Sequence, residues 1–369
     1  MKAIQTAAFE LLLAALRDPA VLPGYSSQDW DQIIRLGRSA DLLARLAALA
    51  QQTGVWECLL AAPRRHLSSA LRLAQRQRRE LDFELEHVGE ALAGNGVPVV
   101  LLKGAAYAAA GLDLARGRLL SDIDILVPRV ALPAAEQALL LSGWVTTKRD
   151  AYDQRYYRTW MHELPPMRHV RRGTAIDVHH ALLPLTARLH PSTDLLLARA
   201  RRLRPDSCLH VLAPHDMVLH SAAHLMHEGE FERGLRGLVD LDALLREFGS
   251  QPGFWSDLVP RAVELELSRP LFYALRYSID FLATPVPPAL LGSLVQASGA
   301  QPGRWSLCWM DMAFRRALRP VNPLVADRWT PLARAFLYLR GHWLRMPPGL
   351  LLMHLSRKAL FSHHSPVPA

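Results

Sequence analysis

Two aspartates one residue apart, Asp122 and Asp124, lie at the start of the apolar run "SDIDILV". On a β-strand, side chains two residues apart point the same way, so both carboxylates would project from one face, roughly 6.6 Å apart at the backbone. Two carboxylates at this separation repel each other unless a cation lies between them. Oxygen ligands of this kind suit Mg²⁺ or Mn²⁺, which usually keep waters and take substrate phosphates as further ligands. The pair is therefore a candidate site for divalent cations.

A third carboxylate can join this pair. In the strand-like segment "TAIDVHHAL", Asp177 and His179 share one face, while Ile176 and Val178 share the other. Two aspartates one residue apart also occur in surface turns and by chance. The residues around Asp122 and Asp124 therefore decide whether the pair indicates a metal site. If the two strands are adjacent, Asp177 completes a set of three carboxylates.

Lys103 and Gly104 lie upstream of the carboxylates, where a buried-looking strand ends and the short helical segment "AAYAAAG" begins. A glycine at this point lets backbone N–H groups at a helix start approach an anion closely. Two arginines, Arg116 and Arg118, follow before the aspartate pair. Carboxylates, a glycine-opened helix and nearby cations together predict metal-assisted phosphate chemistry.

The elements that position these residues form a mixed pattern over residues 94–185. Strands and helices alternate there without a strict βαβ order, which predicts a small α/β sheet. We expect helices in "GAAYAAAGL" and in "ALPAAEQALLLSGW", the second stopped by Gly143. The expected strands are "VPVVLLK", "SDIDILV", "WVTTKR", "QRYYRTWM", "PMRHVRR" and "TAIDVHHAL".

Helical patterns flank this region on both sides. Residues 1–93 contain a clear helix from Pro63 to Leu92, with apolar residues at alternating steps of four and three. Residues 186–360 return to helices, and the tail 361–369 is expected to be disordered. The predicted fold class is α+β, a small mixed-sheet core between two helical regions. In the C-terminal region we expect helices near 187–202, 214–227, 232–248, 254–265, 268–282 and 286–298.

Composition limits the broad class of protein. Lys and Arg outnumber Asp and Glu by 43 to 34, which gives a formal charge of +9 and would suit a polyanionic partner or simply a solvated basic surface. Three distant cysteines indicate neither a disulfide framework nor a thiolate zinc site. The N-terminus reads as an amphipathic helix, and no segment has the length of a membrane span. These features predict a cytoplasmic protein.

The quoted segments resemble the nucleotidyltransferase superfamily with the polymerase-beta-like fold. More closely, they resemble a poorly characterised bacterial nucleotidyltransferase family found in polysaccharide and peptide gene clusters. That family has a "LKG" strand end, an arginine before "DiDlLV", and a later "DlHw". The resemblance covers most of residues 95–245 and includes a His-bearing helix followed by "Rl..l.Dl". The matching positions are Leu102-Lys103-Gly104, Arg118, Asp122 to Val127, and Asp177-Val178-His179.

The resemblance implies transfer of a nucleoside monophosphate from an NTP such as ATP to a hydroxyl of a small molecule, saccharide or peptide. It implies that Asp122, Asp124 and Asp177 hold two Mg²⁺ or Mn²⁺ ions and that Asp177 orients or deprotonates the acceptor. Lys103, with Gly104 and Arg118, would balance the phosphates. His179 would either orient Asp177 or make a structural hydrogen bond.

Two sequence features differ from known motifs, one from the superfamily motif and one from the motif of catalytic zinc helices. Most of the superfamily has a serine after the glycine, but Ala105 follows Gly104, so Lys103 or backbone amides would contact the phosphates. The histidines His220, His224 and His227 suggest a zinc helix, yet the glutamate that such helices place directly after the first histidine is missing. We expect instead that His224 points toward the substrate.

Three alternatives remain open on the sequence alone. The basic helix near residues 63–80 could belong to a nucleic-acid-modifying or nucleic-acid-binding protein of the same fold. The absent serine could mark a catalytically silent nucleotide-binding assembly protein. The basic stretch 333–361 could contact a membrane surface, although a buried amphipathic helix pair with arginine stems over apolar surface explains it as well.

Overall fold

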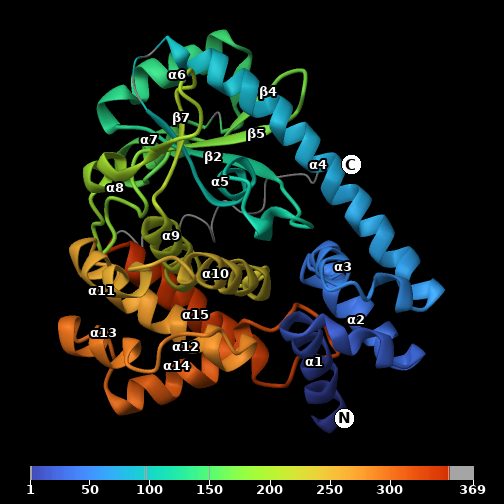
Figure 1. The fold of residues 1–369 in the computed structure, drawn as a ribbon. Helices are drawn as coiled ribbons and strands as arrows, with labels where there is room; N and C mark the ends of the chain where they lie inside the picture. Colours follow the sequence, from blue (N-terminus) through green and yellow to red (C-terminus); the bar gives the residue numbers. More distant parts are fainter. Residues whose placement is uncertain (1, 95, 97, 149, 348, 350–369) are drawn as a thin grey trace.

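The computed structural model describes residues 2–94, 96, 98–148, 150–347 and 349. These residues form a mostly helical molecule with a seven-stranded mixed sheet in the middle and helices before and after it (Figure 1). The α+β class predicted from the sequence is confirmed. Short 3₁₀ turns connect the longer elements at Pro19–Gly24, Trp56–Cys58, Asp113–Ala115 and Arg129–Ala131.

The N-terminal region consists of helices, as the sequence predicts. The longest, α4 (Ala61–Ala93), spans 33 residues and confirms the helix expected from Pro63 to Leu92. Its predicted apolar stripe is buried, because residues spaced by three and four share one helical face. Figure 1 shows α4 running from the N-terminal helices to the edge of the sheet region. The shorter helices are α1 (Lys2–Arg17), α2 (Ser27–Ser39) and α3 (Leu43–Gln52).

The sheet has the strand order β3-β4-β5-β2-β1-β7-β6. Its central pair, β2 and β5, is parallel, as is the pair of β1 and β7, and the other neighbours are antiparallel. Helices α5 (Lys103–Ala109) and α6 (Leu132–Leu141) occur where the sequence predicts them. The strands are β1 (Val99–Leu101), β2 (Asp122–Leu126), β3 (Trp144–Thr146), β4 (Met167–His169), β5 (Ala175–His179), β6 (Arg201–Arg202) and β7 (Leu209–Val211).

One predicted strand is wrong. The segment "QRYYRTWM" belongs to helix α7 (Ala151–Trp160), not to a strand. Its aromatic content favours a strand, but Asp150 caps the helix by accepting hydrogen bonds from the backbone N–H groups of Tyr152 and Asp153. This N-cap satisfies donors that a helix start leaves unpaired, and it outweighs the weak strand propensity.

The sheet also continues past the region where the sequence predicts strands. The helix expected over 187–202 is shorter, α8 (Thr193–Arg199), and the chain then forms the hairpin strands β6 and β7. Strand β7 adds to the edge of β1 in parallel register. Strands of two and three residues carry too few residues for a period-two pattern to be visible in the sequence.

The C-terminal helices follow the prediction closely. Four of them match within about two residues, a normal uncertainty at helix ends, and the segments beyond residue 349 lie outside the described residues. None of the helices in the described residues is both long and apolar enough to cross a membrane. The helices are α9 (Pro214–His227), α10 (Gly234–Gly249), α11 (Phe254–Glu264), α12 (Ser268–Leu282), α13 (Leu290–Ser298), α14 (Arg304–Ala317) and α15 (Thr330–Arg345).

Candidate functional site

The register of β2 and β5 brings the three aspartates together. Asp124 is paired directly with Asp177, and Asp122 lies two residues earlier on the same face. One carboxylate oxygen from each of the three lies within 4.8 Å of the others. The expected proximity of Asp177 to the first pair is therefore confirmed.

The sheet holds this cluster from behind. Ile123 and Ile125, on the opposite face of β2, are 1% and 0% exposed and anchor the strand in the core. On the other side of β2, the backbone N–H of Leu102 donates to the carbonyl of Asp124 at 2.9 Å. Asp124 itself is 2% exposed, whereas Asp177 is half-buried and Asp122, at the start of β2, is exposed, so the cluster extends from the core to the surface.

Lys103 is the cation closest to Asp124. Its Nζ donates to Asp124 Oδ1 at 2.8 Å, and its backbone has a left-handed φ of 47°. A non-glycine residue in this region is strained, and such strain persists where surrounding structure enforces it, as at functional sites. Burial alone would raise the pKa of Asp124. The Lys103 ammonium and the hydrogen bond with His179 nevertheless hold this pKa well below its ordinary value.

His179 contacts Asp124, not Asp177. Its Nε2 lies 3.0 Å from Asp124 Oδ1, and its Nδ1 lies 3.5 Å from Glu163 Oε2. The sequence leaves two roles open for His179, which are to orient Asp177 or to make a structural hydrogen bond. In the structure His179 makes a hydrogen bond, and its partner is Asp124. In this position the imidazole fixes the orientation of Asp124 from the buried side of the site.

Asp177 has the electrostatic environment that a bound cation would relieve. Burial, followed by the nearby carboxylates of Asp124 and Glu163, raises the pKa of Asp177 to about 7. The two other aspartates are close enough to repel its negative charge. Three converging carboxylate oxygens, with the Lys103 ammonium bonded to Asp124, form a donor set suited to a hard divalent ion.

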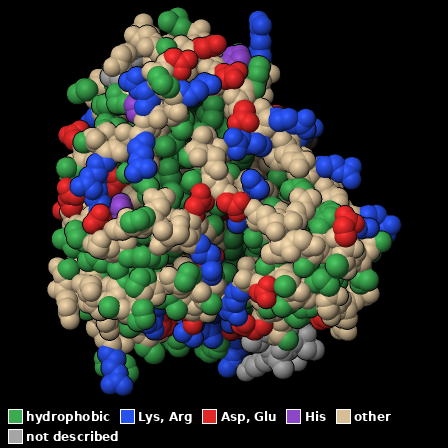
Figure 2. All heavy atoms as spheres, viewed as in Figure 1, with side chains coloured by type: hydrophobic (Ala, Val, Ile, Leu, Met, Phe, Trp, Pro, Cys, Tyr) green, Lys and Arg blue, Asp and Glu red, His purple; other side chains and the backbone are tan. Residues whose placement is uncertain are grey.

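A cavity of about 370 Å³ opens beside the aspartates, between the sheet and helices α9 and α10. Figure 2 shows acidic and basic side chains close together near the middle of the molecule, where the sheet region meets the C-terminal helices. The cavity thus offers both signs of charge to a ligand. Its charged or polar lining includes Lys103, Arg118, Asp122, Asp124, His224, Glu228, Arg233, Arg236 and Asp240.

Gly104 makes room for Arg118 in this cavity. A Cβ at residue 104 would lie 2.1 Å from Nη1 of Arg118 and 2.8 Å from Cδ2 of Leu120. Arg118 donates from Nε to Asp240 Oδ2 at 2.9 Å, and its guanidinium lies over the Tyr107 ring. The glycine predicted to expose backbone amides therefore also has a steric role, which is to admit the arginine.

His224 lines the cavity, as expected, and its Nδ1 makes a hydrogen bond with Glu228. Burial, with smaller effects from His224 and Lys103, lowers the pKa of His220 to about 3. In the described residues, the clusters close enough to hold a metal ion contain none of His220, His224 and His227. Of the three, His224 lines the cavity, whereas His220 and His227 are buried in the interior.

Sequence reasoning missed three charged residues of the cavity. Glu228 follows α9, and Arg236 and Asp240 lie on α10. The partner of Asp240 is Arg118, 122 residues away along the chain. The signal was present in "RGLVDL", which contains the arginine and aspartate of the family-like pattern, but the sequence does not show which cation Asp240 contacts.

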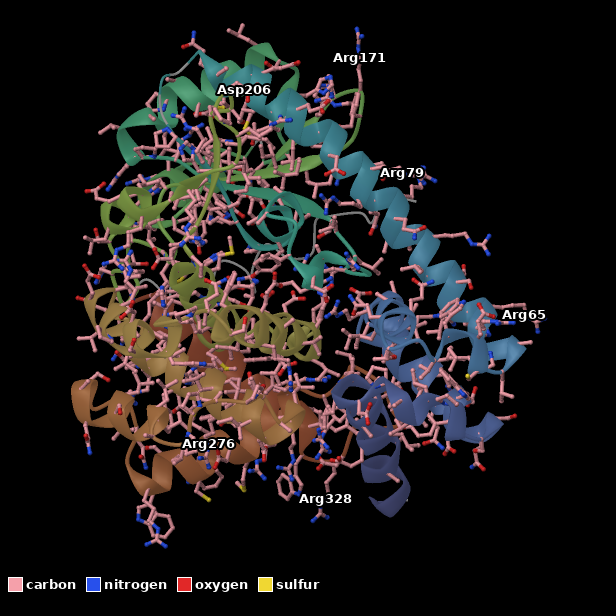
Figure 3. All side chains as sticks on the ribbon, viewed as in Figure 1. Arg65, Arg79, Arg171, Asp206, Arg276 and Arg328 are labelled. Carbon is pink, nitrogen blue, oxygen red and sulfur yellow. The ribbon has the colours of Figure 1, made fainter. Side chains whose placement is uncertain are left out.

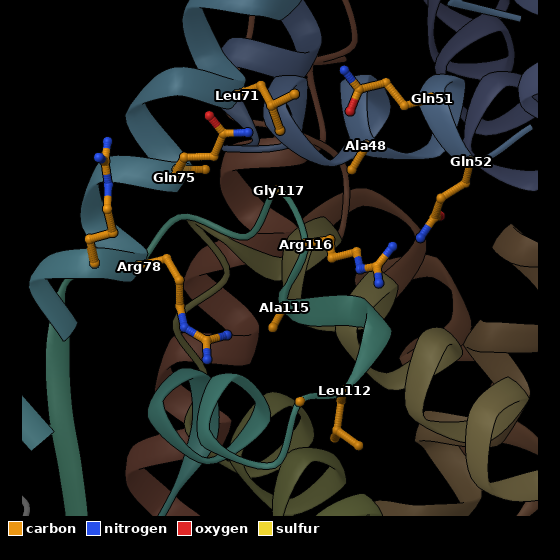
Figure 4. A pocket seen from close by; sticks show the side chains of 13 residues that line it. Ala48, Gln51, Gln52, Leu71, Gln75, Arg78, Leu112, Ala115, Arg116 and Gly117 are labelled. Atoms are coloured by element: carbon orange, nitrogen blue, oxygen red, sulfur yellow. The ribbon is translucent and has the colours of Figure 1, made fainter. Parts of the chain in front are cut away.

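A larger cleft of about 730 Å³ lies elsewhere, between α3, α4 and the segment Gly111 to Gly117. Figure 4 shows Arg78 reaching into it from α4 and Arg116 entering from the opposite wall. Amide and guanidinium groups dominate its polar lining, and none of the described residues that line it carries a carboxylate. Size alone would favour this cleft, but two aspartates of the carboxylate cluster, Asp122 and Asp124, line the smaller cavity.

The comparisons with known proteins agree with the site geometry. A family model described as "uncharacterised nucleotidyltransferase" matches residues 26–283. This range covers well over half of the chain, including the whole sheet, both walls of the cavity and the three aspartates. No curated protein matches the chain.

Proposed function

The chain belongs to the uncharacterised nucleotidyltransferase family, and we propose that it transfers a nucleoside monophosphate from an NTP to a hydroxyl group of a small-molecule, saccharide or peptide acceptor. The observation that carries this proposal is the carboxylate cluster of Asp122, Asp124 and Asp177 on two adjacent parallel strands. The cavity beside it, lined by both cations and anions, provides room for a polyphosphate.

The residues fit the divalent cations that this chemistry needs. Asp122, Asp124 and Asp177 supply only oxygen ligands, the type preferred by Mg²⁺ and Mn²⁺. Burial, together with the nearby carboxylates of Asp124 and Glu163, raises the pKa of Asp177, as is consistent with a site that a cation would stabilise. When bound there, such ions neutralise charge on the attacking and leaving oxygens. We assign these three side chains to hold them.

The side chains in and next to the cavity have separate roles in the transfer. Lys103 and Arg118 donate charge-assisted hydrogen bonds to phosphate oxygens. Asp177 orients the acceptor hydroxyl and takes its proton as the hydroxyl oxygen forms a bond with the α-phosphorus. The bond between the α-phosphorus and the bridging oxygen breaks at the same time, and pyrophosphate leaves. His179 keeps Asp124 in place throughout.

The direct test is to incubate the protein with Mg²⁺, each of the four common NTPs and a panel of hydroxyl acceptors. We expect pyrophosphate release that requires an acceptor. Tight NTP binding without any turnover would favour the catalytically silent assembly protein instead. Absence of both NTP binding and pyrophosphate release from the wild-type chain would contradict the proposed function.

Metal binding should depend on pH because Asp177 must lose its proton to act as a ligand. With a pKa of about 7 in the metal-free protein, the apparent affinity for Mn²⁺ should fall about tenfold for each pH unit below 7 and level off above 8. Calorimetric titration at pH 6, 7 and 8 measures this. The Asp177→Asn variant should lose this pH dependence of Mn²⁺ binding. Equal Mn²⁺ affinities of the wild-type protein at pH 6 and pH 8 would contradict the role of Asp177 as a ligand.

The Gly104→Ala variant should weaken NTP binding about tenfold, the value of one charge-assisted hydrogen bond. The added methyl group displaces the Arg118 guanidinium, whereas the fold should persist because the flexible end of a side chain can move. Gly292→Ala on α13 is the matched control, because nothing lies within 4 Å of its added Cβ. Calorimetry measures the NTP dissociation constants. Equal constants for the two variants would contradict a role of Gly104 in NTP binding.

A nucleic-acid acceptor is less well supported. Arg65 and Arg79 extend outward from α4 (Figure 3), but other arginines of this helix are paired with acidic neighbours, as in Arg76 with Glu80 and Arg78 with Asp82. Figure 2 shows Lys and Arg side chains scattered among acidic ones on the visible face, without a continuous basic stripe. Both features reduce the counterion release that drives nucleic-acid binding.

Contact with an anionic membrane is a second candidate function, separate from catalysis. Helix α15 packs Ala333 and Leu337 inward, as the buried-pair interpretation expects, yet it also presents an apolar stripe to solvent. Its sequence contains three arginines and no acidic residue, which complements an anionic lipid surface. The exposed apolar residues on α14 and α15 or just before α15 are Trp305, Trp309, Met312, Trp329, Leu332, Phe336, Leu339 and Trp343.

Co-sedimentation with vesicles of neutral or partly anionic phospholipid tests this membrane contact. We expect binding to anionic vesicles only, weakened at least about tenfold when Trp305 and Trp309 are both replaced by serine, because two indoles lose their buried apolar area. Leu141→Ser on α6 is the matched control, since this exposed apolar residue is far along the chain from α14. Failure of the wild-type protein to bind anionic vesicles would contradict the contact.

A further inference from the structure

A second cluster of potential metal ligands lies on the other side of the His179 ring from Asp124. It consists of His162, Glu163 and His179, and one ligand atom from each lies within 4.8 Å of the others. Two imidazoles and one carboxylate differ from the all-oxygen aspartate cluster. Nitrogen-containing sets of this kind favour Zn²⁺, Co²⁺ or Fe²⁺ over Mg²⁺.

Paired backbone fixes the positions of these ligands. Glu163 and His179 form an antiparallel β-bridge, and the N–H of Leu164 donates to the carbonyl of Val178 at 2.9 Å. The N–H of His180 donates to the carbonyl of His162 at 2.8 Å. The segment that carries His162 and Glu163 is therefore attached to β5, and the cluster does not depend on a free loop.

The separation of two of the ligand atoms matches that expected around a tetrahedral ion. His179 Nδ1 and Glu163 Oε2 are 3.5 Å apart. Ligands bound at about 2.1 Å with tetrahedral angles lie about 3.4 Å from each other. An ion between these two atoms needs almost no movement of either side chain.

A neutral His179 ring can offer a nitrogen lone pair at this point. In the neutral tautomer that donates from Nε2 to Asp124, the lone pair of Nδ1 faces Glu163. Metal-binding histidines commonly donate their other N–H to a carboxylate in this way. Independently, the buried Nδ1 of His162 has no hydrogen-bond partner in the described residues. Buried polar atoms without a partner call for an explanation, such as an absent ion.

An ion can reach the cluster from the surface. Glu163 lines a cleft of about 260 Å³, together with Tyr157, Leu164 and His180. A workable metal site needs such an entry path in addition to suitable ligands.

From this geometry we propose that His162, Glu163 and His179 bind one transition-metal ion, of the Zn²⁺ or Co²⁺ type, with water in the fourth position. The site is distinct from the aspartate cluster, and His179 connects the two because its other nitrogen holds Asp124. The ion fixes the imidazole and thereby positions Asp124, without touching the substrate.

Co²⁺ titration tests the proposal, because a tetrahedral site with nitrogen ligands gives strong visible ligand-field absorption that an octahedral oxygen site lacks. The wild-type chain and the Asp122→Asn variant are titrated in excess Mg²⁺, which occupies oxygen sites. We expect one equivalent of tetrahedral Co²⁺ in both proteins, displaced by one equivalent of Zn²⁺.

Ligand substitutions then locate the ion. Glu163→Gln and His162→Asn should each weaken Co²⁺ binding more than about 100-fold, beyond the effect typical of an outer-shell partner, whereas His190→Asn, an exposed histidine outside the cluster, should not. Circular dichroism checks that each variant is folded. Absence of tetrahedral Co²⁺ from the wild-type chain would overturn the proposal regardless of how the variants fold. So would unchanged Co²⁺ binding by folded Glu163→Gln protein, since the pair with His179 would then be only a hydrogen bond.

Discussion

Replacing Asp124 by asparagine is expected to lower the rate of pyrophosphate release by at least about 1,000-fold, which corresponds to about 4 kcal/mol of lost transition-state stabilisation. Asp124 is the central carboxylate of the cluster, because it is paired with Asp177 across the strands and fixed by Lys103 and His179. Asparagine keeps the shape of the side chain but removes the charge that holds a cation between the aspartates. The measurement is the turnover rate with saturating NTP and Mg²⁺.

Two comparisons make this expectation specific. Asp206→Asn removes the same charge from an exposed loop at the periphery of the molecule (Figure 3) and should leave turnover unchanged. Calorimetry should show that Asp124→Asn also loses Mn²⁺ binding, which separates a metal defect from a folding defect. A folded Asp124→Asn protein with more than a tenth of the wild-type turnover would contradict the assigned role.

The aspartate cluster was predictable because it depends on short-range patterns. The alternation of Asp and Ile in β2, and the position of Asp177 in β5, place the carboxylates on one face of each strand. The only long-range assumption was that these two strands are neighbours. The family-like motif supplied that assumption, and the register confirms it.

The rest of the cavity was not predictable because it depends on contacts between distant segments. Asp240 becomes part of the site only through Arg118, and Arg118 reaches it only because residue 104 has no Cβ. The long stretch between Gly104 and Asp122 obscured this arrangement in the sequence. It forms α5 and the 3₁₀ turn Asp113–Ala115, which carry Arg118 back over the cavity.

The contacts of the His179 side chain were also not predictable from the sequence. Period two correctly places it on the face of Asp177, but the twist and stagger of neighbouring strands decide which carboxylate its ring reaches. In the folded chain the ring reaches Asp124 on one side and Glu163 on the other. Glu163 lies outside the named strands, so no strand pattern in the sequence could indicate it.

The cavity wall formed by α9 depends on a buried ion pair, and breaking this pair should cost about 3–5 kcal/mol of unfolding free energy. Asp216 on α9 is 0% exposed and Arg261 on α11 is 2% exposed. Two hydrogen bonds join them, from Nε to Oδ1 at 2.7 Å and from Nη2 to Oδ2 at 2.8 Å. The Asp216→Asn variant leaves the buried Arg261 charge with only Glu264, a partner whose side chain is 40% exposed, and removing one member of a buried pair is the most costly way to alter it.

Denaturant unfolding of three variants compares the free energy lost when this buried pair is broken with the free energy lost when an exposed ion pair is broken. Glu136→Gln breaks a pair with Arg158 that is also joined by two hydrogen bonds but is 44% exposed on the arginine side, so it should cost about 1 kcal/mol or less. Replacing Asp216 by leucine and Arg261 by methionine together should recover most of the loss, because neither charge then remains buried alone. If Asp216→Asn is no more destabilising than Glu136→Gln, the connection between α9 and α11 does not depend on this pair, and packing of apolar residues must hold the cavity wall in place.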